Sequence, residues 1–176
     1  MENNNLSSQQ LGIISPGDSV TVFLSRGAFV IGGTCTVTEV TEKTFSLCGH
    51  PFLGEGEIQL PAYRSSIAHT FEGMSSSFKV VGNILEPVGT VVYDNAFAVE
   101  GVRELRPDIK VPINLSVTMD SDHYDYQFEV FRHKFYTSTL VEMGTRFLLE
   151  KLWAETRQGT ARLAAKIYLK GRTEPI

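Results

Sequence analysis

The sequence predicts a mainly β protein, α+β overall, with one helix toward its C-terminal end. Over the first hundred positions, short β-branched or alternating runs are separated by frequent turn signals. A hairpin pattern follows at 111–130, and the residue period then becomes helical at about 140–152. The first part is typical of a barrel or sandwich. The second part predicts a small antiparallel sheet packed with one helix.

Composition restricts the class of protein. The chain has 176 residues, 42% hydrophobic residues and a formal net charge of −4. This length is enough for a domain that holds its core without metal ions or disulfides. This acidic balance argues against a nucleic-acid partner. No stretch approaches the roughly 20 apolar residues of a transmembrane segment. Residues 1–11 are polar, carry no export signal and predict a disordered tail, so the localisation stays open.

The predicted barrel-like unit covers 12–102. Pro16-Gly17-Asp18 is a turn signal before a strand at 19–24, and Gly32-Gly33 interrupts the next apolar run. A second turn is expected at Pro87-Val88-Gly89. Strands are expected at 34–40, 44–48, 58–63, 66–71, 78–81, 90–93 and 96–99.

Two cysteines lie in the hairpin 34–48, and the register decides whether they meet. A two-residue loop sets Cys35 opposite Cys48, close enough to bridge. A three-residue loop pairs Val37 with Leu47 and puts the cysteines on opposite faces. Because a one-residue shift moves every side chain to the other face, burial usually decides the register. The apolar pair favours the second register, so we expect two free thiols.

The composition changes at 103–108, where we place a boundary before a second subdomain, 103–176. Apolar and polar residues alternate in 111–119 and again in 124–130, which predicts a hairpin. Pro112 cannot donate a hydrogen bond to a strand ladder. The strand that contains it should therefore lie at a sheet edge, or be paired on one side only at this position.

An amphipathic helix of about five turns is predicted after the hairpin. Thr137 or Ser138 can cap its start, and Gly159 can end it. A last strand is expected at 163–169. The aromatic stripe in 124–128 should pack on the helix; the alternative is an exposed groove for an extended peptide or a neighbouring protein domain. The helical stripe is Leu140, Met143, Phe147, Leu148 and Leu152.

The candidate active site centres on 48–54, Cys-Gly-His-Pro-Phe-Leu-Gly. His50 lies in a sharp turn, and histidine is the usual proton carrier of hydrolases. A catalytic triad also needs a serine and a carboxylate beside the imidazole. The best set is His50, Asp94 and Ser76, or another serine in 75–77. The structural alternatives are a His50 ring bonded to turn backbone, an Asx turn at Asp94-Asn95 and a solvated serine loop.

Other site types are not predicted, and neither a metal nor a cofactor is expected. Cys48 and His50 lie two residues apart, but no ligand pair has the standard spacing of a zinc site. The glycine loop at 54–57 is acidic and would repel a phosphate. His123 and His133 flank charged turns and are expected to be exposed.

Several motifs, in order and spacing, resemble the SpoIVB-type serine peptidase domain family. The resemblance covers about 12–102. It implies a bacterial, hydrolase-like β fold related to chymotrypsin-like barrels, and it maps the triad histidine of that family onto His50. The motifs are Gly17-Asp18-Ser19-Val20, Gly33-Thr34-Cys35-Thr36-Val37-Thr38, Gly49-His50-Pro51-Phe52-Leu53-Gly54, Ser76-Ser77-Phe78-Lys79 and Glu86-Pro87-Val88-Gly89-Thr90.

The chain departs from this family at the nucleophile. The sporulation peptidases carry a Gly-x-Ser-Gly-Ser-Pro loop after the equivalent of Val130, and this chain instead runs through 133–138 into the helix. It is closer to a non-sporulation branch with Gly-His-Pro-Phe and no serine loop. Two functions compete: a catalytically incomplete relative that acts as a binding or structural module, and an active serine endopeptidase with His50 as general base. Proteins of the resembled family often work outside the cytoplasm.

Overall fold

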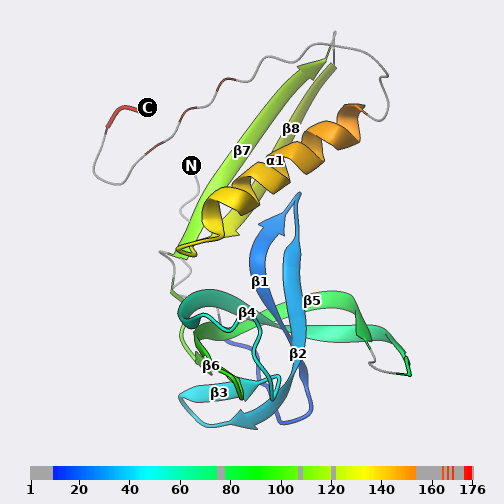
Figure 1. The fold of residues 1–176 in the computed structure, drawn as a ribbon, viewed down its shortest axis with the longest axis vertical. Coiled ribbons are helices and arrows are strands. Elements are labelled where there is room, and N and C mark those ends of the chain that lie inside the picture. The colour runs from blue at the N-terminus through cyan, green and yellow to red at the C-terminus, as the bar shows by residue number, and fades with distance from the viewer. Residues whose placement is uncertain are drawn as a thin grey trace.

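The computed structural model describes residues 10–74, 78–106, 109–119 and 122–153, and also 164, 166, 168 and 173–175. Eight strands form one antiparallel sheet, and one helix follows them in the described chain (Figure 1). The predicted mainly β class with one C-terminal helix is confirmed. The elements are β1 (Ser19–Gly27), β2 (Ile31–Val40), β3 (Thr44–Leu47), β4 (Gly56–Phe71), β5 (Phe78–Asp94), β6 (Val99–Val102), β7 (Lys110–Met119), β8 (Asp122–Phe131) and α1 (Thr137–Trp153).

Some predicted features fall on residues outside this description. They are the polar tail at 1–9, the serines at 75–77, the helix end at Gly159 and most of the expected strand at 163–169. The boundary at 103–108 is described only as far as residue 106.

The strands in the first part of the chain pair in a closed series, because the first and last strands of the series also pair with each other. The sheet order is β2-β3-β6-β5-β4-β1-β8-β7, and β1 also pairs with β2. The strands β2, β3, β6, β5, β4 and β1 are therefore joined in a ring of pairings. Their inward side chains form one apolar core, in which the most deeply buried residues are Val20, Val22, Phe45, Leu47, Leu60, Val88, Val91 and Val99.

β1 connects this ring to the hairpin of β7 and β8. Its residues 20–22 pair with β4, whereas its residues 25–27 pair with β8. The change of partner coincides with an irregularity between Phe23 and Ser25 in the pairing with β2. Leu24 packs against both cores. Strands from both predicted subdomains thus belong to one sheet.

β4 and β5 are longer than the sequence patterns predict. Each joins two segments that we expected as separate strands, and the register shifts several times along their pairing. Such bulges let a strand bend without ending. The expected turn at Pro87-Val88-Gly89 lies inside β5, where a Cβ on Gly89 would come within 2.1 Å of the Val102 carbonyl oxygen. The turn prediction was wrong because bulges and turns use the same residue types.

The second core lies between α1 and the β7–β8 hairpin. The two strands pair without interruption from Lys110↔Phe131 to Met119↔Asp122, and β7 ends the sheet order, as Pro112 predicts. α1 crosses the face of this hairpin and packs mainly over β8 (Figure 1). The buried residues of this core are Phe29, Phe128, Val130, Leu140 and Leu148, with Tyr126 packed against them.

The buried face of α1 is displaced from the predicted stripe. Met143 and Phe147 are 47% and 51% exposed, and Gly144 is buried instead. A Cβ at Gly144 would lie 2.7 Å from Cε2 of Phe128 and 2.8 Å from Cδ1 of Phe29. The missing side chain lets the helix approach these two rings. A glycine carries no hydrophobic signal, so the periodicity placed the centre of the face elsewhere.

Gly144→Leu should destabilise the protein by about 1–3 kcal/mol, because the added side chain overpacks the contact with the Phe29 and Phe128 rings. Urea denaturation monitored by circular dichroism measures the change. Met143→Leu, on the half-exposed side of the same helix turn, is the control and should change stability by less than about 0.5 kcal/mol. Equal effects of the two substitutions would contradict the close approach at Gly144.

Candidate functional site

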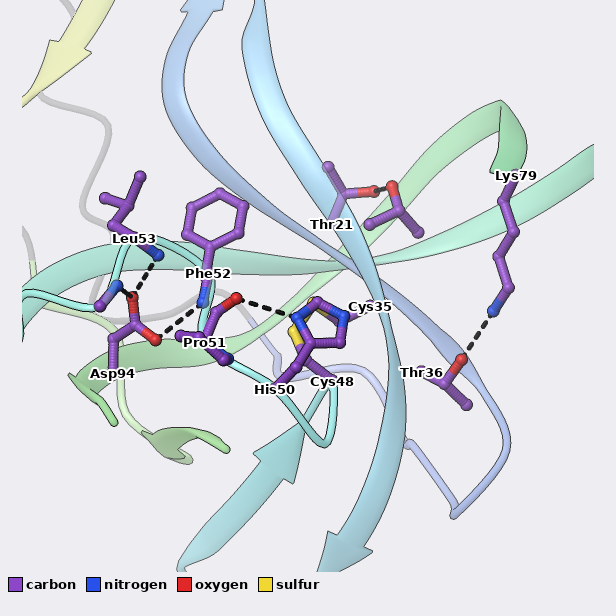
Figure 2. Close-up of a disulfide and its surroundings, with 12 residues drawn as sticks. Thr21, Cys35, Thr36, Cys48, His50, Pro51, Phe52, Leu53, Lys79 and Asp94 are labelled. Atoms are coloured by element: carbon purple, nitrogen blue, oxygen red, sulfur yellow. Dashed lines mark hydrogen bonds between the residues drawn. A yellow bond between two sulfur atoms is a disulfide. The ribbon is translucent and has the colours of Figure 1, made fainter. Parts of the chain in front are cut away.

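The segment that carries the candidate site is a loop fixed at two points. β3 ends at Leu47, and the loop 48–55 leads to the start of β4. Its first residue is bonded to β2, and its residues 52–54 are bonded to the end of β5 (Figure 2). A strand-to-strand connection held at both points presents His50 between them.

The first fixed point is a disulfide between Cys35 and Cys48, with their Cα atoms 4.7 Å apart. The expectation of two free thiols was wrong, although Val37 does pair with Leu47. Cys48 lies beyond β3 with a left-handed φ of 73°, while its N–H donates to the Thr36 carbonyl at 3.0 Å. This one residue turns the cysteine back to the face of Cys35. Strand alternation, on which the prediction rested, does not apply to a residue that has left the strand.

The second fixed point is the carboxylate of Asp94, which is 1% exposed at the end of β5. It accepts hydrogen bonds from three consecutive backbone amides, those of Phe52 (2.8 Å), Leu53 and Gly54 (2.7 Å). Consecutive N–H groups that converge on one anion form a nest, and bonds to an ionised acceptor are the stronger kind. Asp94 therefore closes the loop onto the ring of strands.

His50 is exposed, and its ring bonds within its own loop. The Nδ1 atom lies 2.9 Å from the carbonyl oxygen of Pro51 (Figure 2). A carbonyl is only an acceptor, so Nδ1 is the donor in this hydrogen bond. This geometry matches the structural alternative, in which the ring fixes the turn.

The structure does not bring the described triad candidates together. No hydrogen bond or ion pair between described residues joins His50 to Asp94; each bonds to backbone of the 50–54 loop instead. The Asx turn expected at Asp94-Asn95 is formed by Asn95, whose side-chain oxygen accepts from the amides of Phe97 and Ala98. Ser76 and its neighbours in 75–77 lie outside the described residues, so their distance from His50 is not given by the structure.

The β8–α1 turn lies beside the same loop. Lys134 forms an ion pair with Glu55 at 3.9 Å. The negative charge of Glu55 also interacts electrostatically with the His133 ring. His133 was expected to be exposed, and that was wrong, because it is 7% exposed and stacks on Tyr136. His123, by contrast, is exposed as expected. A residue in a charged turn can still be buried when an aromatic ring stacks on its side chain, as the Tyr136 ring does on His133.

His133 is held in its neutral form. Its Nδ1 accepts the amide of Phe135 at 3.3 Å, which leaves the ring proton on Nε2. Burial lowers the pKa of His133, with the charge of Glu55 opposing and that of Lys134 adding to this effect. The expected cap Thr137 bonds back to the His133 backbone, accepting its N–H at 2.7 Å and donating to its carbonyl at 2.8 Å. These contacts fix the turn into α1.

Sequence reasoning missed a polar cluster between β5 and the β1–β2 pair. The ammonium group of Lys79 donates to Oγ1 of Thr36 at 2.7 Å (Figure 2). It also donates to Oγ of Ser19 at 3.3 Å. Beside it, the hydroxyls of Thr21 and Thr34 lie 2.8 Å apart. The cluster fixes the outer part of β5 on the ring. Alternation assigns Lys79 to a face of its strand, but it does not give the contact.

No group of three or more His, Cys, Asp or Glu side chains among the described residues is arranged to hold a metal ion, and Cys48 is engaged in the disulfide. Within the same residues, no helix combines the length and apolar composition needed to cross a membrane.

Comparison with protein-family models, with curated proteins and with solved structures found no match to this chain.

Asp94→Asn should destabilise the protein by about 2–4 kcal/mol. The substitution replaces a charged acceptor of hydrogen bonds from the loop amides with a neutral side chain whose own N–H group faces those amides. Urea denaturation measures the loss, and hydrogen exchange should show the amides of 52–54 becoming less protected. The control is Asp18→Asn, which removes an exposed carboxylate that accepts one amide, that of Ser15. Unchanged exchange at 52–54 would sink the assignment of Asp94 as the loop anchor.

Stability should depend on pH through His133. Because its pKa is lowered in the folded state, its contribution is full above the unfolded value of about 6.5 and is lost progressively as the pH falls below it. Urea midpoints between about pH 5 and 7.5 should therefore drop toward acid. His133→Asn should flatten this dependence, whereas His123→Asn should leave it as in the wild type. Equal slopes for all three proteins would refute the role of His133.

Proposed function

We propose that this chain is a catalytically incomplete relative of the SpoIVB-type serine peptidases and acts as a binding or structural module. The observation that carries the proposal is the engagement of Asp94. Its carboxylate accepts three loop amides and makes no described contact with His50. A triad needs that carboxylate on the imidazole, where it orients the ring and stabilises the imidazolium. Here the backbone carbonyl of Pro51 accepts the hydrogen bond from Nδ1–H of His50 instead.

The ring of strand pairings supports the finer part of the proposal, a barrel-type unit over 12–102. In that ring β1 pairs with both β2 and β4, so the pairing has no free side within the six strands. The resembled family implies a barrel of this general kind. The place of its serine loop is taken in this chain by the short β8–α1 turn, in which Lys134 pairs with Glu55.

The disulfide supports a location of the protein outside a reducing cytoplasm. Disulfides persist in oxidising compartments and are rare where thioredoxin and glutathione keep thiols reduced. The pair Cys35–Cys48 lies at the base of the candidate loop, so the loop geometry depends on the oxidised state. This agrees with the extracytoplasmic setting of the proteins that the chain resembles.

A serine-directed fluorophosphonate probe tests the lack of catalysis. Incubated with the folded chain near neutral pH, the probe should leave the wild type no more labelled than His50→Ala, because a catalytically incomplete module does not activate a serine. A casein substrate should likewise stay uncleaved. Trypsin, treated in the same way, is the positive control for both readouts.

The competing function has a distinct signature in the same experiment. Labelling of the wild type that disappears in both His50→Ala and Ser76→Ala would establish an active serine endopeptidase and overturn the proposal. Mass spectrometry of the labelled peptide would then identify the serine. Labelling that persists in His50→Ala reports chemical reactivity without a general base, and it leaves the non-catalytic assignment standing.

A further inference from the structure

In the part of the chain that the structure describes, β7 is an edge strand without the usual protection of an edge. It ends the sheet order, and among the described strands it pairs with β8 alone. Natural proteins protect such edges with prolines, charges or bulges, because unpaired backbone groups recruit other strands. Lys110 and Pro112 stand at the beginning of β7, but from residue 113 to Met119 there is no proline, no charge and no break in register. Seven consecutive positions of this edge are therefore ready to pair.

The backbone groups that face outward can be identified. The amide of Arg132 donates to the carbonyl of Ile109 at 2.6 Å, in the same register as the β7–β8 pairs. Since bonded and non-bonded pairs alternate in an antiparallel ladder, the odd-numbered residues of β7 bond to β8. The bond from the Ala28 amide to Gln127, on the far side of β8, agrees with this phase. The outward amides are consequently those of Asn114, Ser116 and Thr118.

The side chains along this edge are sorted by face. α1 packs mainly over β8, so the apolar row of β7 on the helix side is only half-buried. The opposite row is exposed, polar and uncharged beyond Pro112. A strand placed beside β7 would bury apolar side chains at every second position against the first row. That row is Val111, Ile113, Leu115, Val117 and Met119.

Charge distinguishes among occupants of this edge. In the described strands, β7 and β8 carry the carboxylates of Asp122, Asp125 and Glu129 against the one ammonium group of Lys110. A second copy of this hairpin would bring the same excess of negative charge to the contact. A segment with lysine or arginine at its polar positions would instead be attracted.

We propose that the open edge of β7 binds an extended segment of a partner protein by strand addition, and that this segment alternates apolar with basic residues. The inference deepens the proposed function as a binding module and rests on it. Main-chain hydrogen bonds to the outward groups of Asn114, Ser116 and Thr118 supply the affinity, and the half-buried apolar row supplies the selectivity.

The test uses a capped, fluorescein-labelled octapeptide in which valine alternates with lysine and threonine, followed by fluorescence anisotropy on the full chain. We expect saturable binding that weakens with added salt. Ser116→Pro removes one outward amide and none that bonds to β8, so it should reduce the affinity at least about tenfold. Ser116→Ala is the matched control, because it keeps the amide, and it should bind within about twofold of the wild type. Circular dichroism and urea midpoints check that both variants fold.

A second arm needs no variant. The same peptide, N-methylated at every second residue so that one edge loses its donors, should not bind the wild type. Binding that survives N-methylation, or an unchanged affinity in folded Ser116→Pro, would overturn the proposal. Sedimentation velocity of the wild type alone belongs to the same test, since self-association abolished by Ser116→Pro would assign the edge to a second copy instead.

The peptide is also recovered and weighed by mass spectrometry after binding. An intact peptide that does not bind refutes the docking edge and leaves the non-catalytic function in place. A peptide that binds and is cleaved supports the docking edge and refutes the non-catalytic function. The two ideas therefore fail in different ways.

Discussion

The rest of this structure depends on the hydrogen bonds that the Asp94 carboxylate accepts from three successive amides, those of residues 52–54 in the loop 48–55. Burying either the carboxylate or the amides without the other would be unfavourable. A buried carboxylate without partners loses its hydration, and buried amides without acceptors lose theirs. Together they satisfy one another, and they tie the connection between β3 and β4 to a strand 40 residues further along the chain.

The disulfide complements this interaction at the other end of the loop. By closing a segment with a sequence separation of 13, it restricts the unfolded chain, an effect of about 3 kcal/mol for a loop of this length. It also holds Cys48 in a left-handed conformation, which a residue other than glycine adopts at a cost of about 1 kcal/mol or more. Gly33 completes the arrangement, since a Cβ there would meet the ring of Phe52.

The sequence predicts those features that depend on periodicity and fails where one residue or one distant contact decides. The β class, the hairpin of β7 and β8, the edge position of Pro112 and the long helix all follow from patterns several residues long. The disulfide depends on the left-handed backbone of a single residue, Cys48. An alternating pattern of polar and apolar residues does not reveal such a conformation. The partner of Asp94 and the burial of His133 depend on long-range contacts. The local sequence names the right residues at the site, but it does not assign their roles.

Those roles bear on the choice between catalysis and support. An aspartate that orients a catalytic imidazole accepts a hydrogen bond from the ring N–H, so the ring must lie beside its carboxylate. Asp94 instead uses both oxygens for the loop, and His50 turns its Nδ1 to the adjacent carbonyl of Pro51. The closure that makes this loop rigid therefore uses the group that a triad would need. β1 pairs with β4 inside the ring and with β8 outside it, so the strands that hold this loop belong to the same sheet as the hairpin, whose outer edge is unpaired in the described chain.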